Sequence, residues 1–110
     1  MNDQLVADVL NRSAKRIMVP GQWTKNALAR DAKSQIVHPR DPSATCWCAM
    51  GAIEVECGVD KDLLVDVDKY LFNWLSQERF TGIATVNDTA FRPSVPASAM
   101  QLAAQALLLP

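Results

Sequence analysis

The stretch CWCAMGAIEVECG, residues Cys46–Gly58, contains all three cysteines of the chain. Asp41 and Pro42, which precede it, are residue types favoured at the N-cap and at the first position of a helix. Gly58 is typical of the position that follows the last turn of a helix. The pattern therefore predicts a helix over residues 42–57.

This predicted helix is apolar on two sides, so we expect it to be buried between neighbouring elements. Gly51 in its middle costs about 1 kcal/mol of helix propensity relative to alanine. The close approach of another backbone is the expected reason for a glycine there. The two apolar stripes consist of Cys46, Met50, Ile53 and Cys57 on one side and of Cys48, Ala52 and Val55 on the other.

His38 and the three cysteines are potential zinc ligands that lie close together in the sequence. On one helix, however, Cys48 and Cys57 would lie on opposite sides of the axis and about 13 Å apart along it. Two ligands of one zinc ion lie about 4 Å apart. The sequence therefore predicts no metal site, and it contains no phosphate-binding loop or other motif that would indicate a cofactor.

The cysteines leave two interpretations open. Cys46 and Cys57 are expected to be small core residues, as free cysteines usually are. Cys48 is expected in the first turns of the helix, where the dipole and free N–H groups can stabilise a thiolate. With His38 as a base and Asn87–Asp88 as an orienting group, it has the residue types of a Cys-His-Asn nucleophile. Packing of Cys48 in the core is the favoured alternative.

Helical spacing of apolar residues recurs in three other segments. The first begins at Asn2 or Asp3, which can cap it, and ends before Pro20. Between the first and second helices, two short segments flank a polar stretch and favour a β-hairpin. The further predicted helices cover residues 3–18, residues 60–77 and a last segment from Ser94 or Pro96, and the predicted hairpin arms are residues 27–30 and 35–37.

The expected fold class is therefore mainly α, or α+β if the hairpin forms. It has about four helices packed around the central buried helix, as one domain over residues 1–110. Residues 80–93 are expected to be a connection with a few extended residues around 83–86. Within it, Asn87–Asp88 is expected to form a turn or to cap the backbone.

Composition is that of a globular protein, with 49% hydrophobic and 21% charged residues. The first residues have no basic and apolar pattern, so we expect no leader, and no apolar stretch approaches the roughly 18 residues of a membrane span. An odd number of cysteines without such a leader favours reduced thiols in the cytoplasm. We expect no membrane partner.

The net charge of −1 provides no overall attraction for nucleic acid, which is therefore not an expected partner. The charges are uneven, however: residues 1–40 carry seven Lys and Arg and three Asp and Glu, and residues 41–78 carry two and eight. The simpler interpretation is that the two segments attract each other within the fold. The alternative is a basic binding face. The candidate binding residues are Trp23, Arg12, Lys15, Arg16 and Arg30, with Lys25 beside them.

The last predicted helix carries the small-residue stripe Ala99, Leu102, Ala103 and Ala106, which would allow another helix to approach closely. Three consecutive leucines, residues 107–109, follow it. Because neighbours on a helix point about 100° apart, all three cannot pack on one surface. Either this end frays or a second copy covers it, and the sequence leaves a homodimer and a frayed end equally open.

In order along the chain, GQWTKNALARDAKSQ, DPSATCWCAMGAIE and IATVND resemble a family of bacterial and bacteriophage proteins, domain of unknown function 6197. The recurring positions are Trp47, Cys48, Gly51, Ala52, Asn87 and Asp88. Gln22 intrudes between Gly21 and Trp23, and Val86 replaces a frequent tryptophan. The resemblance implies a prokaryotic or phage cytoplasmic setting and no activity.

From these observations we predict a non-enzymatic accessory protein that binds another protein. The alternative is a hydrolase or transferase that uses Cys48 as its nucleophile.

Overall fold

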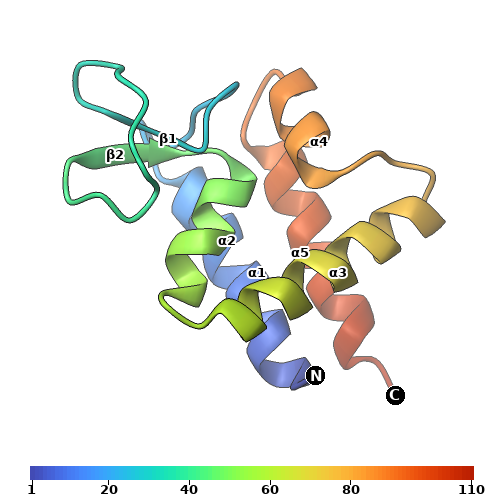
Figure 1. The fold of residues 1–110 in the computed structure, drawn as a ribbon. Helices are drawn as coiled ribbons and strands as arrows, with labels where there is room; N and C mark the ends of the chain where they lie inside the picture. Colours follow the sequence, from blue (N-terminus) through green and yellow to red (C-terminus); the bar gives the residue numbers. More distant parts are fainter.

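A computed structural model describes residues 1–110 and confirms the mainly α fold class, with one small antiparallel sheet between the first two helices. The chain forms five helices and two strands (Figure 1). None of the helices is both long and apolar enough to cross a membrane. The elements are α1 (Asp3–Met18), β1 (Ala29–Asp31), β2 (Ala44–Trp47), α2 (Ala49–Cys57), α3 (Lys61–Gln77), α4 (Ile83–Thr89) and α5 (Ser94–Leu108).

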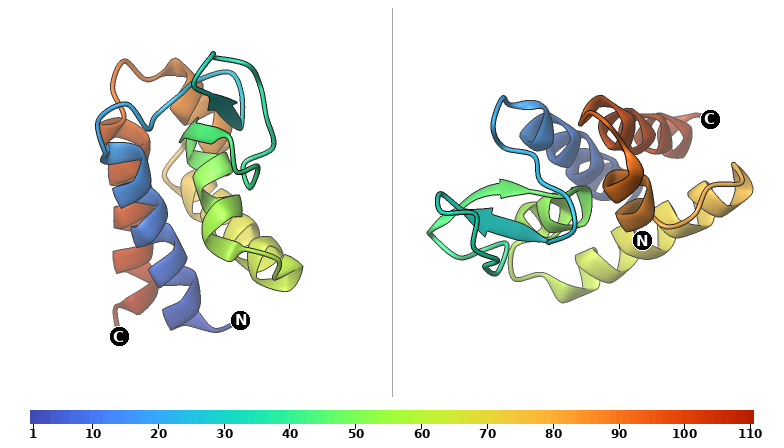
Figure 2. Two further views of the ribbon diagram at one scale, coloured as in Figure 1. Left: turned by 90° about the vertical axis from the view of Figure 1, so that its left-hand side faces the viewer. Right: turned by 90° about the horizontal axis from the view of Figure 1, so that it is seen from above.

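The helices α1 and α5 lie side by side and antiparallel, so that both ends of the chain emerge at the same end of the molecule (Figures 1 and 2). Asn2 begins α1 by accepting a hydrogen bond from the Leu5 N–H. The predicted stripe of α1 is buried, and α2 packs across the opposite side of α1 from α5. Together these helices and α3 enclose one hydrophobic core of 20 residues.

The helix α2 begins at Ala49, so the prediction that it begins at Pro42 is wrong. Asp41 caps a turn instead, because its Oδ1 accepts hydrogen bonds from the N–H and the hydroxyl of Ser43. The next residues are drawn into β2 by pairing with β1. Trp47 also forms a parallel bridge with Trp23 on the other edge. Tertiary pairing therefore overrides a local helix-start signal.

This shift changes the position of two cysteines. Cys46 belongs to β2 and is only half buried, with its thiol directed at the Arg30 carbonyl, so the prediction that it is a core residue on a helix face is wrong. Cys48 is the N-cap of α2 rather than a residue within it, and its Sγ accepts a hydrogen bond from the Gly51 N–H at 3.3 Å. Cys57 is buried in the core as predicted.

The hairpin lies between α1 and α2 as predicted, but its principal second arm is β2. The register pairs Ala29 with Trp47, with an irregularity after Arg30. The predicted arm at residues 35–37 contributes only a single bridge, between Arg30 and Ile36. A longer loop than expected therefore connects the two strands.

Gly51 confirms the expected close approach. A Cβ built on it would lie 1.9 Å from the carbonyl oxygen of Leu28, which accepts a hydrogen bond from the Cys48 N–H at 3.1 Å. The first turn of α2 therefore lies directly against the backbone of Leu28, the residue before β1. Only glycine fits at position 51 in this arrangement.

The predicted connection contains a further helix, α4, so the expected extended residues at 83–86 are wrong. Ile83 and Asn87, four residues apart, form its buried face. In α5 the buried face also differs from the predicted stripe: Ala103 is buried, Ala99 is half buried, and Leu102 and Ala106 are exposed. The residues that do pack inward are Pro96, Ala97, Met100, Ala103 and Ala104.

Candidate functional site

Asn87 is fully buried and joins three parts of the chain from its place on α4. Its Oδ1 accepts hydrogen bonds from Trp23 Nε1 at 2.7 Å and from the Ala49 N–H at 3.0 Å. Its Nδ2 donates to the Thr24 carbonyl at 3.1 Å. Because Ala49 is the first residue of α2, this side chain satisfies an N–H group that the helix itself leaves free.

Asp88 holds the same loop at a second point. Its Oδ1 accepts hydrogen bonds from the Asn26 N–H at 2.9 Å and from Asn87 Nδ2 at 3.1 Å. Asn26 has a φ of +63°, a left-handed conformation that such a tertiary contact supports. Lys25 adds a third contact, from its Nζ to the Ala90 carbonyl. Asn87–Asp88 therefore lies in a helix and not in a turn. Of the two predicted roles, a turn or a backbone cap, the structure shows the cap, made with segments distant in the sequence.

Cys48 lies beside this network but is buried. Burial raises the pKa of its thiol, and the Asp88 carboxylate raises it further, against the opposing hydrogen bonds from the first turn of α2. Burial, with a smaller contribution from Asp60, also raises the pKa of Cys57, to about 11. No surface hollow is lined by Cys48. Both thiols are therefore held in their neutral form.

His38 lies elsewhere, on the exposed loop that leads to β2. Its Nδ1 accepts a hydrogen bond from the Arg40 N–H, and its Nε2 lies 3.6 Å from Glu54 Oε1. The structure thus brings Cys48 and Asn87–Asp88 together but gives His38 other partners. No group of three His, Cys, Asp or Glu side chains is arranged to hold a metal ion.

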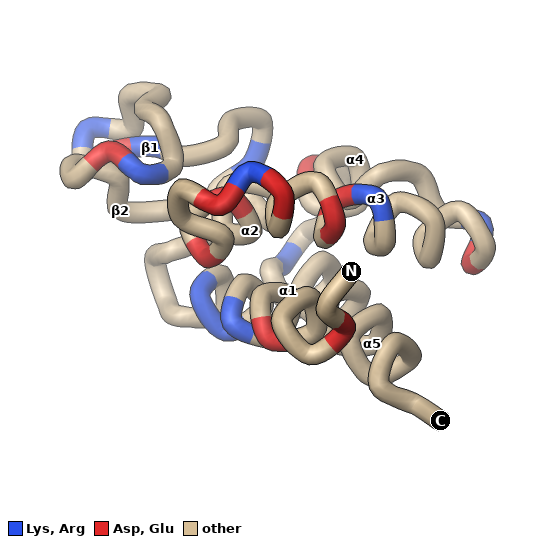
Figure 3. The backbone as a smooth tube through the Cα atoms, turned by 60° about the horizontal axis from the view of Figure 1, so that its bottom comes forward, with Lys and Arg blue, Asp and Glu red and all other residues tan.

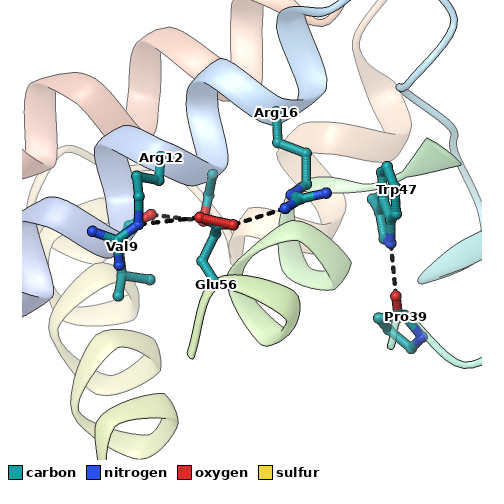
Figure 4. Close-up of polar contacts among 7 residues, drawn as sticks. Val9, Arg12, Arg16, Pro39, Trp47 and Glu56 are labelled. Carbon is teal, nitrogen blue, oxygen red and sulfur yellow. Dashed lines mark hydrogen bonds and ion pairs between the residues drawn. The ribbon is translucent and has the colours of Figure 1, made fainter. Parts of the chain in front are cut away.

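The basic residues of α1 meet an acidic residue of α2, as the uneven charges predict. Glu56 accepts from Arg12 Nε at 3.1 Å and from Arg16 Nη2 at 2.9 Å (Figure 4). The Arg16 guanidinium also lies 4.7 Å from the centre of the Trp47 ring, whose Nε1 donates to the Pro39 carbonyl. These contacts connect α1, α2 and β2.

The other candidate binding residues have structural contacts or are solvated. Arg30 donates to the carbonyls of Ser34 and Lys25 and so holds the turn after β1. Trp23 is half buried against Asn87. Lys15 is exposed at a shallow basic hollow of about 330 Å³ beside Arg12 and Arg16. The two arginines there are already paired with Glu56.

Two apolar hollows lie away from the basic hollow, where α3, α4 and α5 meet. They are not predicted from the sequence. We call them the α5 hollow, of about 360 Å³, and the α4 hollow, of about 520 Å³. They share Phe80, Val86 and Val95. The α5 hollow is further lined by Trp74, Leu75, Ser94, Ser98, Ala99 and Leu102, and the α4 hollow by Thr81, Thr89, Ala90, Phe91 and Arg92.

Large apolar side chains stand exposed around both hollows. Phe91 is 98% exposed, Phe80 56% and Leu102 54%. Arg92 is the single charged residue that lines either hollow, and it forms no ion pair. Figure 3 shows that α5 carries no charged residue along its length, whereas α1 and α3 carry several. Two sequence features could have predicted this apolar surface. They are the phenylalanines Phe80 and Phe91 on loops and the absence of charged residues from the last segment.

The chain belongs to the family of unknown function DUF6197, whose model matches residues 1–106. The match covers every helix except the last two residues of α5. No curated protein and no solved structure matches the chain.

Proposed function

We propose that this DUF6197 domain is a non-enzymatic binding module that takes an apolar, carboxylate-bearing segment of another protein into the α4 hollow. The observation that carries the proposal is the nearly complete exposure of Phe91 at the rim of that hollow, next to Arg92. A phenylalanine left in water forgoes roughly 1.5–3 kcal/mol of burial free energy. A partner that covers it recovers this free energy.

The residue types around the α4 hollow support a protein partner. Aromatic residues and arginine are enriched at protein–protein interfaces and dominate their binding energy. Phe80 and Phe91 flank the hollow, and Val86 and Val95 form part of its apolar wall. An apolar side chain of the partner would enter this hollow while the two rings cover its sides.

Charge complementarity indicates what the partner carries. Arg92 is the single charged residue at the hollow, and its guanidinium has no carboxylate within the chain. A carboxylate on the partner would make a charge-assisted and bidentate hydrogen bond there. The occupant is therefore a segment with apolar side chains and an Asp or Glu next to them.

We further propose that the protein works in the cytoplasm. In support, all three cysteines are free, as is usual for thiols in a reducing compartment.

A peptide-display selection against the immobilised protein tests the binding proposal. We expect the enriched peptides to combine apolar residues with Asp or Glu. Fluorescence anisotropy measures how tightly they bind. Their binding is expected to shift the NMR signals of Phe91, Arg92 and Val95. Arg92→Glu is expected to weaken binding about tenfold or more, since a like charge then faces the peptide carboxylate.

The matched control is Lys69→Glu, which reverses one charge on an exposed position of α3 that lines neither hollow. This variant is expected to bind as the wild type does. Selection that enriches no peptide, NMR shifts confined to another face, or equal effects of the two charge reversals would contradict the proposal.

A further inference from the structure

The helix α5 carries a second apolar face that its own domain covers only in part, at the half-buried Ala99. From Ser94 to Pro110 the chain has no charged residue. Outside the buried face, five apolar positions follow one another at spacings of four, three, four and three residues. We call this the α5 seam; it consists of Val95, Ala99, Leu102, Ala106 and Leu109.

The α5 seam is continuous and accessible. At 100° per residue, the four positions within α5 fall within an arc of about 60° on the helix surface, and Leu109 follows the last turn in an extended conformation. Leu102 is 54% and Leu109 71% exposed, and Ala106 is exposed beside them. A surface helix normally presents charged residues on its outer face. Apolar positions repeating every 3.5 residues are instead the pattern of a helix that packs against another helix.

We propose that the α5 seam is the interface of a two-fold symmetric homodimer, in which two α5 helices pack antiparallel with Leu102 of each protomer over Ala99 of the other. This inference is argued from the α5 seam and not from the partner proposed for the α4 hollow, although Val95 belongs to both surfaces. It also differs from pairing through the three terminal leucines alone, because Leu107 packs against the core of its own domain.

The order of side-chain sizes along the α5 seam selects the register. Large and small residues alternate, from Val95 through Ala99, Leu102 and Ala106 to Leu109. In an antiparallel pair whose two-fold axis passes between residues 100 and 101, Leu102 faces Ala99 and Val95 faces Ala106. Every large side chain in these pairs faces a small one, which is the arrangement that fills an interface without voids.

The α5 hollow receives the inserted leucine in this arrangement. Ala99 and Leu102 both line the hollow, and Trp74 and Phe80 form further parts of its wall. A methyl group at position 99 leaves room that a larger side chain would occupy. Leu102 of the second protomer enters that room, as a knob enters a hole between packed helices.

The absence of charge makes the α5 seam compatible with a second copy as its occupant. A two-fold axis through α5 places each residue near its symmetry mate, and charged residues there would face like charges. The helix has none, so its face is electrostatically compatible with itself. On α5 itself, no charged residue stands beside the seam to select an unlike partner.

Sedimentation equilibrium over a concentration series tests the dimer. We expect the wild type to approach twice its 12.1 kDa mass. Leu102→Asp is expected to weaken dimerisation about a hundredfold or more, because the two-fold axis makes each substitution act twice. Val65→Asp is the matched control, since Val65 is exposed to a similar degree on α3 and lines neither hollow. This variant is expected to dimerise like the wild type.

Disulfide trapping tests the register. With Cys46 replaced by serine, differently tagged Ala99→Cys and Leu102→Cys chains are expected to form a mixed disulfide faster than either chain pairs with itself. Far-ultraviolet circular dichroism checks that the variants fold.

A wild type that stays at 12.1 kDa at high micromolar concentration, or a dimer that Leu102→Asp leaves intact, overturns the proposal. Self-pairing of Ala99→Cys chains would overturn the antiparallel register. Peptide binding at Arg92 is measured on the Leu102→Asp variant, whose substitution lies outside the α4 hollow, so that the two proposals fail separately.

Discussion

Trp23 and Asn87 are 64 positions apart in the sequence, and a hydrogen bond of 2.7 Å joins the indole Nε1 of one to the side-chain oxygen of the other. The same oxygen accepts from the first N–H of α2. One buried amide thus fixes the loop before β1, the start of α2 and the position of α4. Because α4 forms a wall of both hollows, this contact also positions the proposed binding surfaces.

Replacing Asn87 by alanine is expected to lower the free energy of unfolding by about 2–5 kcal/mol. The substitution leaves the N–H groups of Trp23 and Ala49 without acceptors, and each unsatisfied buried group costs about 1–3 kcal/mol. Urea denaturation followed by tryptophan fluorescence measures the change. Asn73→Ala, at an exposed position of α3, is the control and is expected to change stability by less than about 0.5 kcal/mol. Equal effects of the two substitutions would contradict the role of Asn87.

Gly51→Ala is expected to destabilise the protein strongly, although alanine favours a helix by about 1 kcal/mol. The added methyl group would lie 1.9 Å from the Leu28 carbonyl oxygen, a backbone atom that cannot move aside without disturbing its hydrogen bond from the Cys48 N–H. We expect a loss of more than about 3 kcal/mol or a failure to fold. Gly82→Ala is the matched control, because no atom lies within 4 Å of the Cβ it would add. Thermal unfolding that shows the two variants to be equally stable would contradict this account.

Glu56→Gln is expected to lower stability by about 1–3 kcal/mol, because it removes the carboxylate to which both Arg12 and Arg16 donate. Glu56 is largely buried, so water replaces this interaction poorly. Glu54→Gln makes the same chemical change on the same helix, where the nearest basic side chain is the more exposed His38 at 3.6 Å. Its effect is expected to stay below about 1 kcal/mol. Denaturation of both variants in the same buffer decides between them, and an equal loss would argue against the role of Glu56.

Stability is expected to fall as the pH rises from about 9 to about 11. The pKa of Cys57 is raised from 9.0 to about 11 in the folded protein, chiefly by burial. Above pH 9 the unfolded chain therefore loses this proton before the folded one does, which favours unfolding. The contribution of the protonated Cys57 thiol to stability is complete below pH 9. It is lost as the pH reaches the folded-state pKa of about 11. Cys57→Ala, compared with the wild type by urea denaturation at each pH, is expected to show a shallower decline. Parallel curves for the two proteins would contradict the assignment to Cys57.

Local signals were sufficient to predict four of the five helices, although the start of α2 was predicted seven residues too early. For α1 and α3, an N-cap residue and a continuous apolar stripe act within a few turns of the chain, and Asn2 and Asp60 make the expected capping hydrogen bonds. The Gly51 contact was also predictable, because glycine in a buried helix usually marks a close backbone approach. The charge imbalance between the two halves predicted the pairing of α1 with α2.

The start of α2, the existence of α4 and the place of Asn87–Asp88 could not be predicted, because each depends on a distant partner. Asp41-Pro42 is as compatible with a turn as with a helix start, and pairing of β2 with β1 decides between them. The β-branched residues before Asn87 favour an extended segment locally, but burial of Ile83 and Asn87 on one side favours a helix. The convergence of Cys48 with Asn87–Asp88, and the separate position of His38, likewise follow from the packing.

By itself the sequence determined the fold class, the extents of α1 and α3 and the beginning of α5, because backbone capping and apolar periodicity act between residues at most a few turns apart. The tertiary structure alone decided which face of α5 is buried and where the two hollows open. Both faces of that helix are apolar, so its own periodicity cannot distinguish the side that packs on α1 from the α5 seam. That choice is made by the shape of the surfaces that α1, α3 and α4 present to it, and these surfaces exist only after the chain has folded.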